Sequence, residues 1–195
     1  MRSFEHERRA VLRAAALGAV ALVAGGGPSN AQAAIRNISV ERLTVVSAKP
    51  FTAVVSAFES SIGRPDMNEF MKALGAAQTY ADMEKVVQGV VGPFGLMQFA
   101  RYDLGFVIGK EAGRQANSSR FLVGNPLIMK DMAKHVPDAG SYAPVTVLID
   151  ERAGGVHLSY DKMASFLAPY GNEDALKVAR DLDVKIETIL KTAAA

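Results

Sequence analysis

Residues 145–160 read VTVLIDERAGGVHLSY, and this stretch decides the fold. Two β-rich segments, 145–149 and 156–160, flank a turn that contains Gly154 and Gly155, which predicts an antiparallel hairpin. Downstream, Asn172 precedes an apolar stripe at helical spacing, which predicts a long helix. The stripe consists of Ala175, Ala179, Leu182, Ile186 and Leu190. Consecutive strands followed by a helix favour an antiparallel α+β layer over a parallel, doubly wound sheet.

The segments before the hairpin supply the rest of this layer. We expect an antiparallel sheet of about five strands with two main helices on one face, in the order strand, helix, short helices, several strands and a long helix. Short helices are expected within residues 66–93, where Asp66 and Thr79 are the expected helix caps. The other expected strands cover residues 38–46, 96–108 (continuous, or broken at 103–105) and 120–123, and residues 109–118 are expected to form a polar loop. The expected helices cover residues 51–62, 66–74, 79–90, 126–135 and 172–191.

The first 33 residues are typical of a cleavable export signal. Arg8 and Arg9 precede a hydrophobic pair and a third arginine, a pattern that favours the twin-arginine route over the general secretory one. The apolar run 14–24 is shorter than the ~20 residues that span a bilayer, and Ala31 and Ala33 fit a signal-peptidase site. We therefore expect a periplasmic or secreted, soluble protein without a stable membrane anchor, with residues 34–195 forming a single domain.

Removal of the signal changes the charge balance. The chain has 22 Lys and Arg and 20 Asp and Glu, and residues 1–33 hold four Arg and two Glu, which leaves 18 of each sign. A neutral domain without a basic run lacks the electrostatic footprint of a nucleic-acid-binding protein. The absence of cysteine excludes disulfides, thiolate metal sites, iron–sulfur clusters and covalently attached c-type haem. A homo-oligomer joined through an exposed strand edge remains open.

Candidate site residues gather around the predicted hairpin. Strand alternation puts His157 on the face of Ser159 and opposite Val156, Leu158 and Tyr160, so His157 is either an exposed strand residue or a proton-transfer or anion-binding group. Four further residues are candidates to line a pocket for a small polar or anionic ligand. These are Tyr142, Arg152, Tyr160 and Asp161, with the alternatives that Arg152 is a turn residue and Asp161 a cap.

A weaker metal candidate lies on the expected helix 126–135. Met129, Met132 and His135 offer thioether and imidazole ligands that suit Cu(I). Positions i and i+6 lie about 240° apart around a helix, so the three side chains cannot all point one way. Methionines at helical spacing are more typical of core packing.

Three motifs together resemble the family known as domain of unknown function 302. They are residues 121–126, which contain the Gly124-Asn125-Pro126 turn, residues 142–149 with a proline-initiated strand, and residues 156–161, which end in Ser-Tyr-Asp. The resemblance covers residues 38–190 and implies a β-α-β4-α layer of the TATA-binding-protein-like type. Two features depart from the family pattern: residues 101–104 lack its Asp-His, and residues 66–93 are an insertion. Asn125 is also explained as the cap of a helix that begins at Pro126.

These observations leave three functional hypotheses. The first is a small-ligand-binding or interaction module. The second is an enzyme of unknown reaction that uses His157 with Asp161 or Arg152, which requires these side chains to converge on one cavity. The third is a periplasmic metal or haem carrier, a class that the twin-arginine route, which exports folded proteins, mildly favours.

Overall fold

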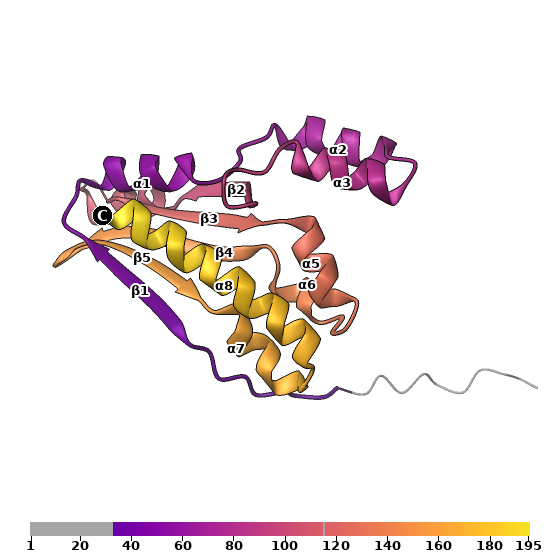
Figure 1. The fold of residues 1–195 in the computed structure, drawn as a ribbon. Coiled ribbons are helices and arrows are strands. Elements are labelled where there is room, and N and C mark those ends of the chain that lie inside the picture. The colour runs from indigo at the N-terminus through magenta and orange to yellow at the C-terminus, as the bar shows by residue number, and fades with distance from the viewer. Residues whose placement is uncertain (1–32, 115) are drawn as a thin grey trace, which may run out of the picture. The chain divides into compact units, whose positions relative to one another are not determined.

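Five strands form one antiparallel sheet in the order β1-β5-β4-β3-β2 (Figure 1). The computed structural model describes residues 33–114 and 116–195, and residues 37–195 form one compact unit. The strands are β1 (Arg42–Ser47), β2 (Met97–Asp103), β3 (Ser118–Gly124), β4 (Val145–Arg152) and β5 (Gly155–Asp161). The α+β class and the five-stranded antiparallel sheet expected from the sequence are therefore confirmed.

The helices fill the connections between these strands. They are α1 (Phe51–Ser60), α2 (Met67–Ala76), α3 (Tyr80–Gln88), α4 (Leu104–Ala112), α5 (Pro126–Ala133), α6 (Ala139–Tyr142), α7 (Met163–Leu167) and α8 (Glu173–Ala194), with a 3-10 turn η1 (Ala168–Tyr170). Side-chain caps form at Asp66, Thr79, Asn125 and Asn172, each of which accepts a hydrogen bond from a backbone N–H of the first turn. These four caps confirm the expected helix starts.

The predicted hairpin lies at the centre of the fold. Strands β4 and β5 pair with Asp150 opposite His157 and Arg152 opposite Gly155. Gly154 and Gly155 have φ angles of 95° and 124°, which L side chains rarely adopt. A Cβ at Gly155 would also lie 2.4 Å from the carbonyl oxygen of Ser47, so the glycine lets β1 approach the hairpin closely.

Helices α1 and α8 lie on the same face of the sheet, which we call the core face (Figure 1). Val156, Leu158 and Tyr160 of β5 are buried on this face, as the alternation predicts. The predicted stripe of α8 is buried against them, together with Val54 and Phe58 of α1. Each Å² of apolar surface removed from water contributes roughly 25 cal/mol to stability, so this buried layer is the main source of the protein's stability.

Helices α2 and α3 occupy the segment expected to be an insertion and extend past the end of β2 in Figure 1. They bury a small cluster of their own, made by Phe70, Val87, Met97 and Leu127. Met97 and Leu127 come from β2 and α5, so this cluster joins the two helices to the main layer.

Helix α4 corrects the sequence reading of residues 96–118. Strand β2 ends at Asp103, in agreement with the expected break at 103–105. Helix α4 then follows, where the sequence predicted a continued strand up to residue 108 and a polar loop from residue 109. The Asp103 side chain accepts a hydrogen bond from the Phe106 N–H and so caps this helix. A Cβ at Gly105 would lie 2.1 Å from the carbonyl oxygen of Ala116, so the glycine lets α4 pack against the returning chain.

The predicted export signal lies outside the described residues, except for Ala33. Arg8, Arg9 and Ala31 therefore have no structural counterpart here. Within the part of the chain that the structure describes, no helix combines the length and the apolar character needed to cross a membrane.

Candidate functional site

The second face of the sheet, which we call the open face, carries the side chains that alternate with those of the core face. Arg42, Thr44, Val46, Arg120 and Thr146 on this face are all exposed. The strand register brings together open-face residues from distant parts of the sequence: Arg42 lies opposite Asp161, and Thr44 opposite Ser159. This face is therefore the part of the sheet that a ligand reaches.

A cavity of about 370 Å³ lies on the open face where β4 begins and β5 ends, and we call it the Arg120 cavity. Its size falls within the range of ~300–1,000 Å³ that is usual for small-molecule sites. The described residues that line it are Arg120, Leu122, Ser141, Tyr142, Ala143, Pro144, Val145, Thr146, Asp161 and Phe166. Three strands and helices α6 and α7 contribute to it, so it exists only in the folded sheet.

The two charged residues that line the Arg120 cavity differ in whether they are already ion-paired within the protein. Asp161 is its one carboxylate among the described lining residues, and Arg42 binds both oxygens of it with N···O distances of 2.6 and 2.7 Å. This hydrogen bond raises the pKa of Arg42, because the Asp161 carboxylate stabilises the charged guanidinium. Arg120 forms no ion pair with any described residue; its guanidinium carbon lies 6.0 Å from the centre of the Tyr102 ring. The cavity thus presents an unneutralised guanidinium.

An aromatic wall bounds the Arg120 cavity on the side of α6 and α7. The rings of Tyr142 and Phe166 stack with centroids 4.9 Å apart and an interplanar angle of 19°. The Tyr142 hydroxyl lies 3.0 Å from the Tyr170 hydroxyl, and this hydrogen bond raises the pKa of Tyr170. Tyr142 is therefore held at both its ring and its hydroxyl.

A second open-face cavity of about 750 Å³ lies near the turn of the hairpin. Asp150 and Arg152 line it, and they form an ion pair at 3.2 Å. Asp150 Oδ1 and Nε2 of His157, its cross-strand neighbour, are buried without a hydrogen-bond partner among the described residues. Because neighbouring atoms cover both of these atoms, a ligand in this conformation reaches neither.

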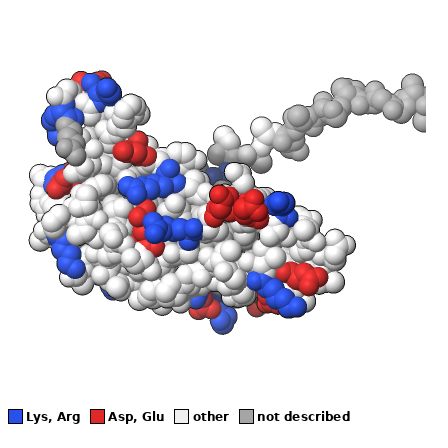
Figure 2. All heavy atoms as spheres, turned by 90° about the horizontal axis from the view of Figure 1, so that it is seen from above, with Lys and Arg blue, Asp and Glu red and all other residues white. Residues whose placement is uncertain are grey.

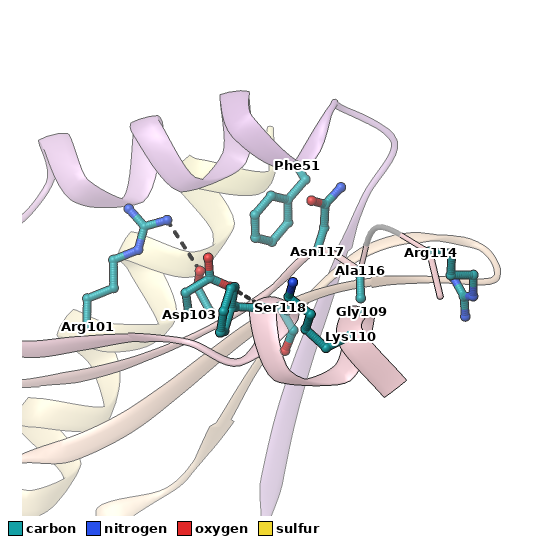
Figure 3. A pocket seen from close by; sticks show the side chains of 12 residues that line it. Phe51, Arg101, Asp103, Gly109, Lys110, Arg114, Ala116, Asn117 and Ser118 are labelled. Atoms are coloured by element: carbon teal, nitrogen blue, oxygen red, sulfur yellow. Dashed lines mark hydrogen bonds between the residues drawn. The ribbon is translucent and has the colours of Figure 1, made fainter. Parts of the chain in front are cut away.

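A third cavity, of about 380 Å³, lies between the start of α1 and α4 (Figure 3). Phe51 and Asn117 point into it, whereas Arg114 points away from the other labelled side chains. Arg101 donates hydrogen bonds to Glu59 and Ser119, and Asp103 caps α4. Its best-placed charges are thus already used within the protein.

A fourth cavity, of about 420 Å³, adjoins a buried carboxylate on the helix side. Asp183 of α8 is 7% exposed and accepts hydrogen bonds from the Tyr160 hydroxyl at 2.6 Å, the Met163 N–H at 2.8 Å and the Ala164 N–H at 3.1 Å. Burial raises the pKa of Asp183, against the effect of these donors, and burial together with the Asp183 charge raises the pKa of Tyr160. The network joins β5, α7 and α8 and leaves no carboxylate oxygen unpaired.

The structure distributes the five predicted site residues over both faces. Tyr142 and Asp161 line the Arg120 cavity, and Arg152 lines the second open-face cavity, near the turn of the hairpin. His157 shares the open face but lines none of the four cavities, and Tyr160 points into the core. Asp161 lies in β5, where Arg42 of β1 binds its carboxylate, and it does not cap a helix.

Arg120, Thr146 and Phe166 are among the lining residues that sequence reasoning did not single out as site residues. Arg120 stands in the expected strand 120–123 as its one charged residue, which was the available signal. Phe166 carries no comparable signal, because only the path of the chain after β5 brings it beside Tyr142.

The residues of the metal hypothesis point to different surroundings. Met132 is fully buried in the core, and His135 is exposed beyond the end of α5. Among residues 33–114 and 116–195, no group of three His, Asp or Glu side chains is placed to hold a metal ion. Figure 2 shows basic and acidic side chains in small mixed groups over one face of the molecule.

Comparison with known proteins gives a family and a fold. No curated protein matches the chain. Its structure is similar to the crystal structure of the uncharacterized conserved protein DUF302 from Bacillus stearothermophilus, with a TM-score of 0.53, 12% sequence identity, and coverage of 78% of this chain and 97% of that one. At this identity the likeness shows the fold alone. The family model described as domain of unknown function DUF302 matches residues 72–193, which is more than half of the chain, and the protein belongs to that family.

Proposed function

We propose that this domain binds a small anionic ligand in the Arg120 cavity. The observation that carries the proposal is the imbalance of charge there: Asp161 is bound through both oxygens by Arg42, whereas Arg120 has no carboxylate partner among the described residues. The guanidinium is a planar fork of donors that matches a carboxylate or a phosphate. An anion would therefore complete the site.

Hydroxyl groups supplement the guanidinium. Thr146 lines the cavity and carries a hydroxyl that can donate to an anion, and the Tyr142 hydroxyl can do so while it accepts from the Tyr170 hydroxyl. Ser141 is a weaker candidate, because its hydroxyl already donates to the Asp138 carbonyl oxygen at 2.7 Å. A charged donor with two neutral ones is sufficient for a modest, reversible affinity.

Binding is better supported than catalysis. The enzyme hypothesis needs His157 on one cavity with Asp161 or Arg152, and His157 lines none of the four cavities. In the other three cavities Arg101, Arg152 and Asp183 are engaged in internal ion pairs or hydrogen bonds, whereas Lys110 and Arg114 form no ion pair with a described residue. The Arg120 cavity adds a stacked pair of aromatic rings to such a cation. We therefore propose a binding module with no turnover of its ligand.

Isothermal titration calorimetry with acetate, benzoate and inorganic phosphate tests this proposal. We expect at least one of these anions to bind the wild type and the Arg120→Gln variant to lose roughly tenfold or more in affinity. The matched control is Arg64→Gln, which removes an exposed arginine that already pairs with Glu59. Equal affinities of Arg120→Gln and wild type, or no binding of any of the three anions, would reject the proposal.

We also propose that the protein works outside the cytoplasm, because residues 1–33 resemble a twin-arginine signal. Replacing both Arg8 and Arg9 by lysine should retain the full-length chain in the cytoplasm on cell fractionation. Unchanged export of this variant would point to the general secretory route. A wild-type chain that stays cytoplasmic and uncleaved would contradict export itself.

A further inference from the structure

We infer that the ligand of the Arg120 cavity is an aromatic carboxylate, with its carboxylate on Arg120 and its ring against the Tyr142–Phe166 wall. This inference rests on the proposed function, since it specifies what that same cavity binds. It follows from the surfaces that face each other across the cavity.

The first observation is the apolar character of the cavity away from Arg120. Leu122, Pro144 and Val145 line it together with the rings of Tyr142 and Phe166. A compact hydrated anion such as acetate or phosphate would cover Arg120 and leave this apolar surface wet. A ligand with an apolar body removes the same surface from water, which is favourable in proportion to the area covered.

The second observation is the rigidity of the wall. Tyr142 of α6 stacks on Phe166 of α7 at 4.9 Å, and its hydroxyl bonds to that of Tyr170 in η1, so three elements together fix one ring. Because the ring is already ordered, a ligand that packs against it loses little additional side-chain entropy. A flat, preformed surface suits a flat partner, since aromatic pairs prefer offset-stacked or edge-to-face arrangements.

The third observation is the size of the site. A cavity of about 370 Å³ stands near the lower end of the usual range for small-molecule sites. It therefore fits a ligand with one ring better than a dinucleotide or an oligomer. Asp161, already neutralised by Arg42, adds no net repulsion to the carboxylate of such a ligand.

The experiment compares benzoate, cyclohexanecarboxylate and acetate by calorimetry on the intact domain. These probes share a carboxylate and differ in the ring and in its flatness. We expect benzoate to bind at least about tenfold more tightly than acetate, and more tightly than cyclohexanecarboxylate. Equal affinity for acetate and benzoate overturns the inference and leaves the anion site standing. No binding of any of the three carboxylates overturns the inference, and the anion site then stands only if phosphate binds.

Two variants test the role of the wall by the ratio of benzoate to acetate affinity, a readout that a general loss of stability does not mimic. Phe166→Leu keeps an apolar side chain but removes the stack, and we expect the ratio to fall about threefold or more. Tyr142→Phe keeps the ring and its stack on Phe166 but removes the hydroxyl bond to Tyr170 that helps to fix the ring, so the ratio should fall less than in Phe166→Leu, by up to about twofold. An unchanged ratio in Phe166→Leu, or tighter binding of cyclohexanecarboxylate than of benzoate, overturns the inference.

Discussion

Tyr160 and Asp161 are neighbours in β5, yet they belong to different parts of the molecule. The Tyr160 side chain lies on the core face, 1% exposed, with its hydroxyl bonded to Asp183. Asp161 lies on the open face, where Arg42 binds it and Arg120 stands in the same cavity. Strand alternation alone separates the two environments.

The difference teaches which polar groups serve the fold and which are available to a ligand. On the core face, Asp183 meets three donors from within the chain, so its charge is used to hold β5, α7 and α8 together. On the open face, Arg120 has no such partner among the described residues. Substitutions on the core face should therefore mainly change stability, whereas substitutions on the open face should mainly change ligand binding.

The largest expected effect is that of Asp183→Ala on stability. It removes the acceptor of the Tyr160 hydroxyl and of the Ala164 N–H, and it leaves the Met163 N–H only its longer bond to the Tyr160 hydroxyl at 3.2 Å. We expect a loss of roughly 3 kcal/mol in the free energy of unfolding. Urea denaturation measures it. Asp183→Asn keeps an acceptor for Tyr160 and Met163 and should cost clearly less; equal losses in the two variants would show that the hydrogen bonds are not the cause.

The next effect is a dependence of stability on alkaline pH through Tyr160. Its pKa is raised in the native state by burial and by the Asp183 charge, whereas an unfolded tyrosine ionises near pH ~10. The contribution of Tyr160 to stability is therefore complete below about pH 10 and falls by about 1.4 kcal/mol per pH unit above it.

The Tyr160→Phe variant should remove this part of the alkaline slope, as measured by urea denaturation between about pH 9 and 12. Tyr102→Phe, which alters a tyrosine that is 49% exposed, is the matched control and should leave the slope unchanged. A Tyr160→Phe slope equal to that of wild type would mean that the core-face hydroxyl does not resist ionisation.

The smallest expected effects come from the Arg42–Asp161 pair on the open face, and they have opposite signs. Arg42→Ala exposes the Asp161 carboxylate to a bound anion and should weaken its binding about threefold. Asp161→Asn releases Arg42 and should strengthen it about threefold. Both effects should shrink as salt is added.

Neither variant should change stability by more than about 1 kcal/mol, because exposed ion pairs contribute little. Calorimetry in low and high salt gives the affinities, and thermal unfolding gives the stability. If the affinity for the anion changed in the same direction in both variants, the bound anion would not interact electrostatically with the Arg42–Asp161 pair.

The sequence predicts the parts of this molecule that depend on local rules. The hairpin, the four side-chain caps and the stripe of α8 follow from spacing and residue type, and all are confirmed. Helix α4 was not predicted, because Phe106, Val107 and Ile108 form a short apolar run that fits a strand as well as a helix. Their exposure of 65%, 68% and 46% shows that burial did not decide its structure.

The candidate site could be predicted only in part for a different reason. Alternation placed Asp161 correctly with respect to Tyr160, and Tyr142 was near the hairpin in sequence. The cavity, however, depends on β3 lying beside β4, which pairs Leu122 with Thr146 and Arg120 with Leu148, and on α7 folding back beside α6. Such non-local pairings are properties of topology, and residue spacing does not contain them.

Mapping of amide chemical-shift changes by NMR during a titration with benzoate tests the central claim most directly. The claim that the open face binds the ligand predicts that the largest changes fall on residues 120–122, 141–146, 161 and 166, and that they vanish in Arg120→Gln. Changes centred on Phe51 and Lys110 between α1 and α4, or on Arg180 and Asp183 on the helix side, would contradict it.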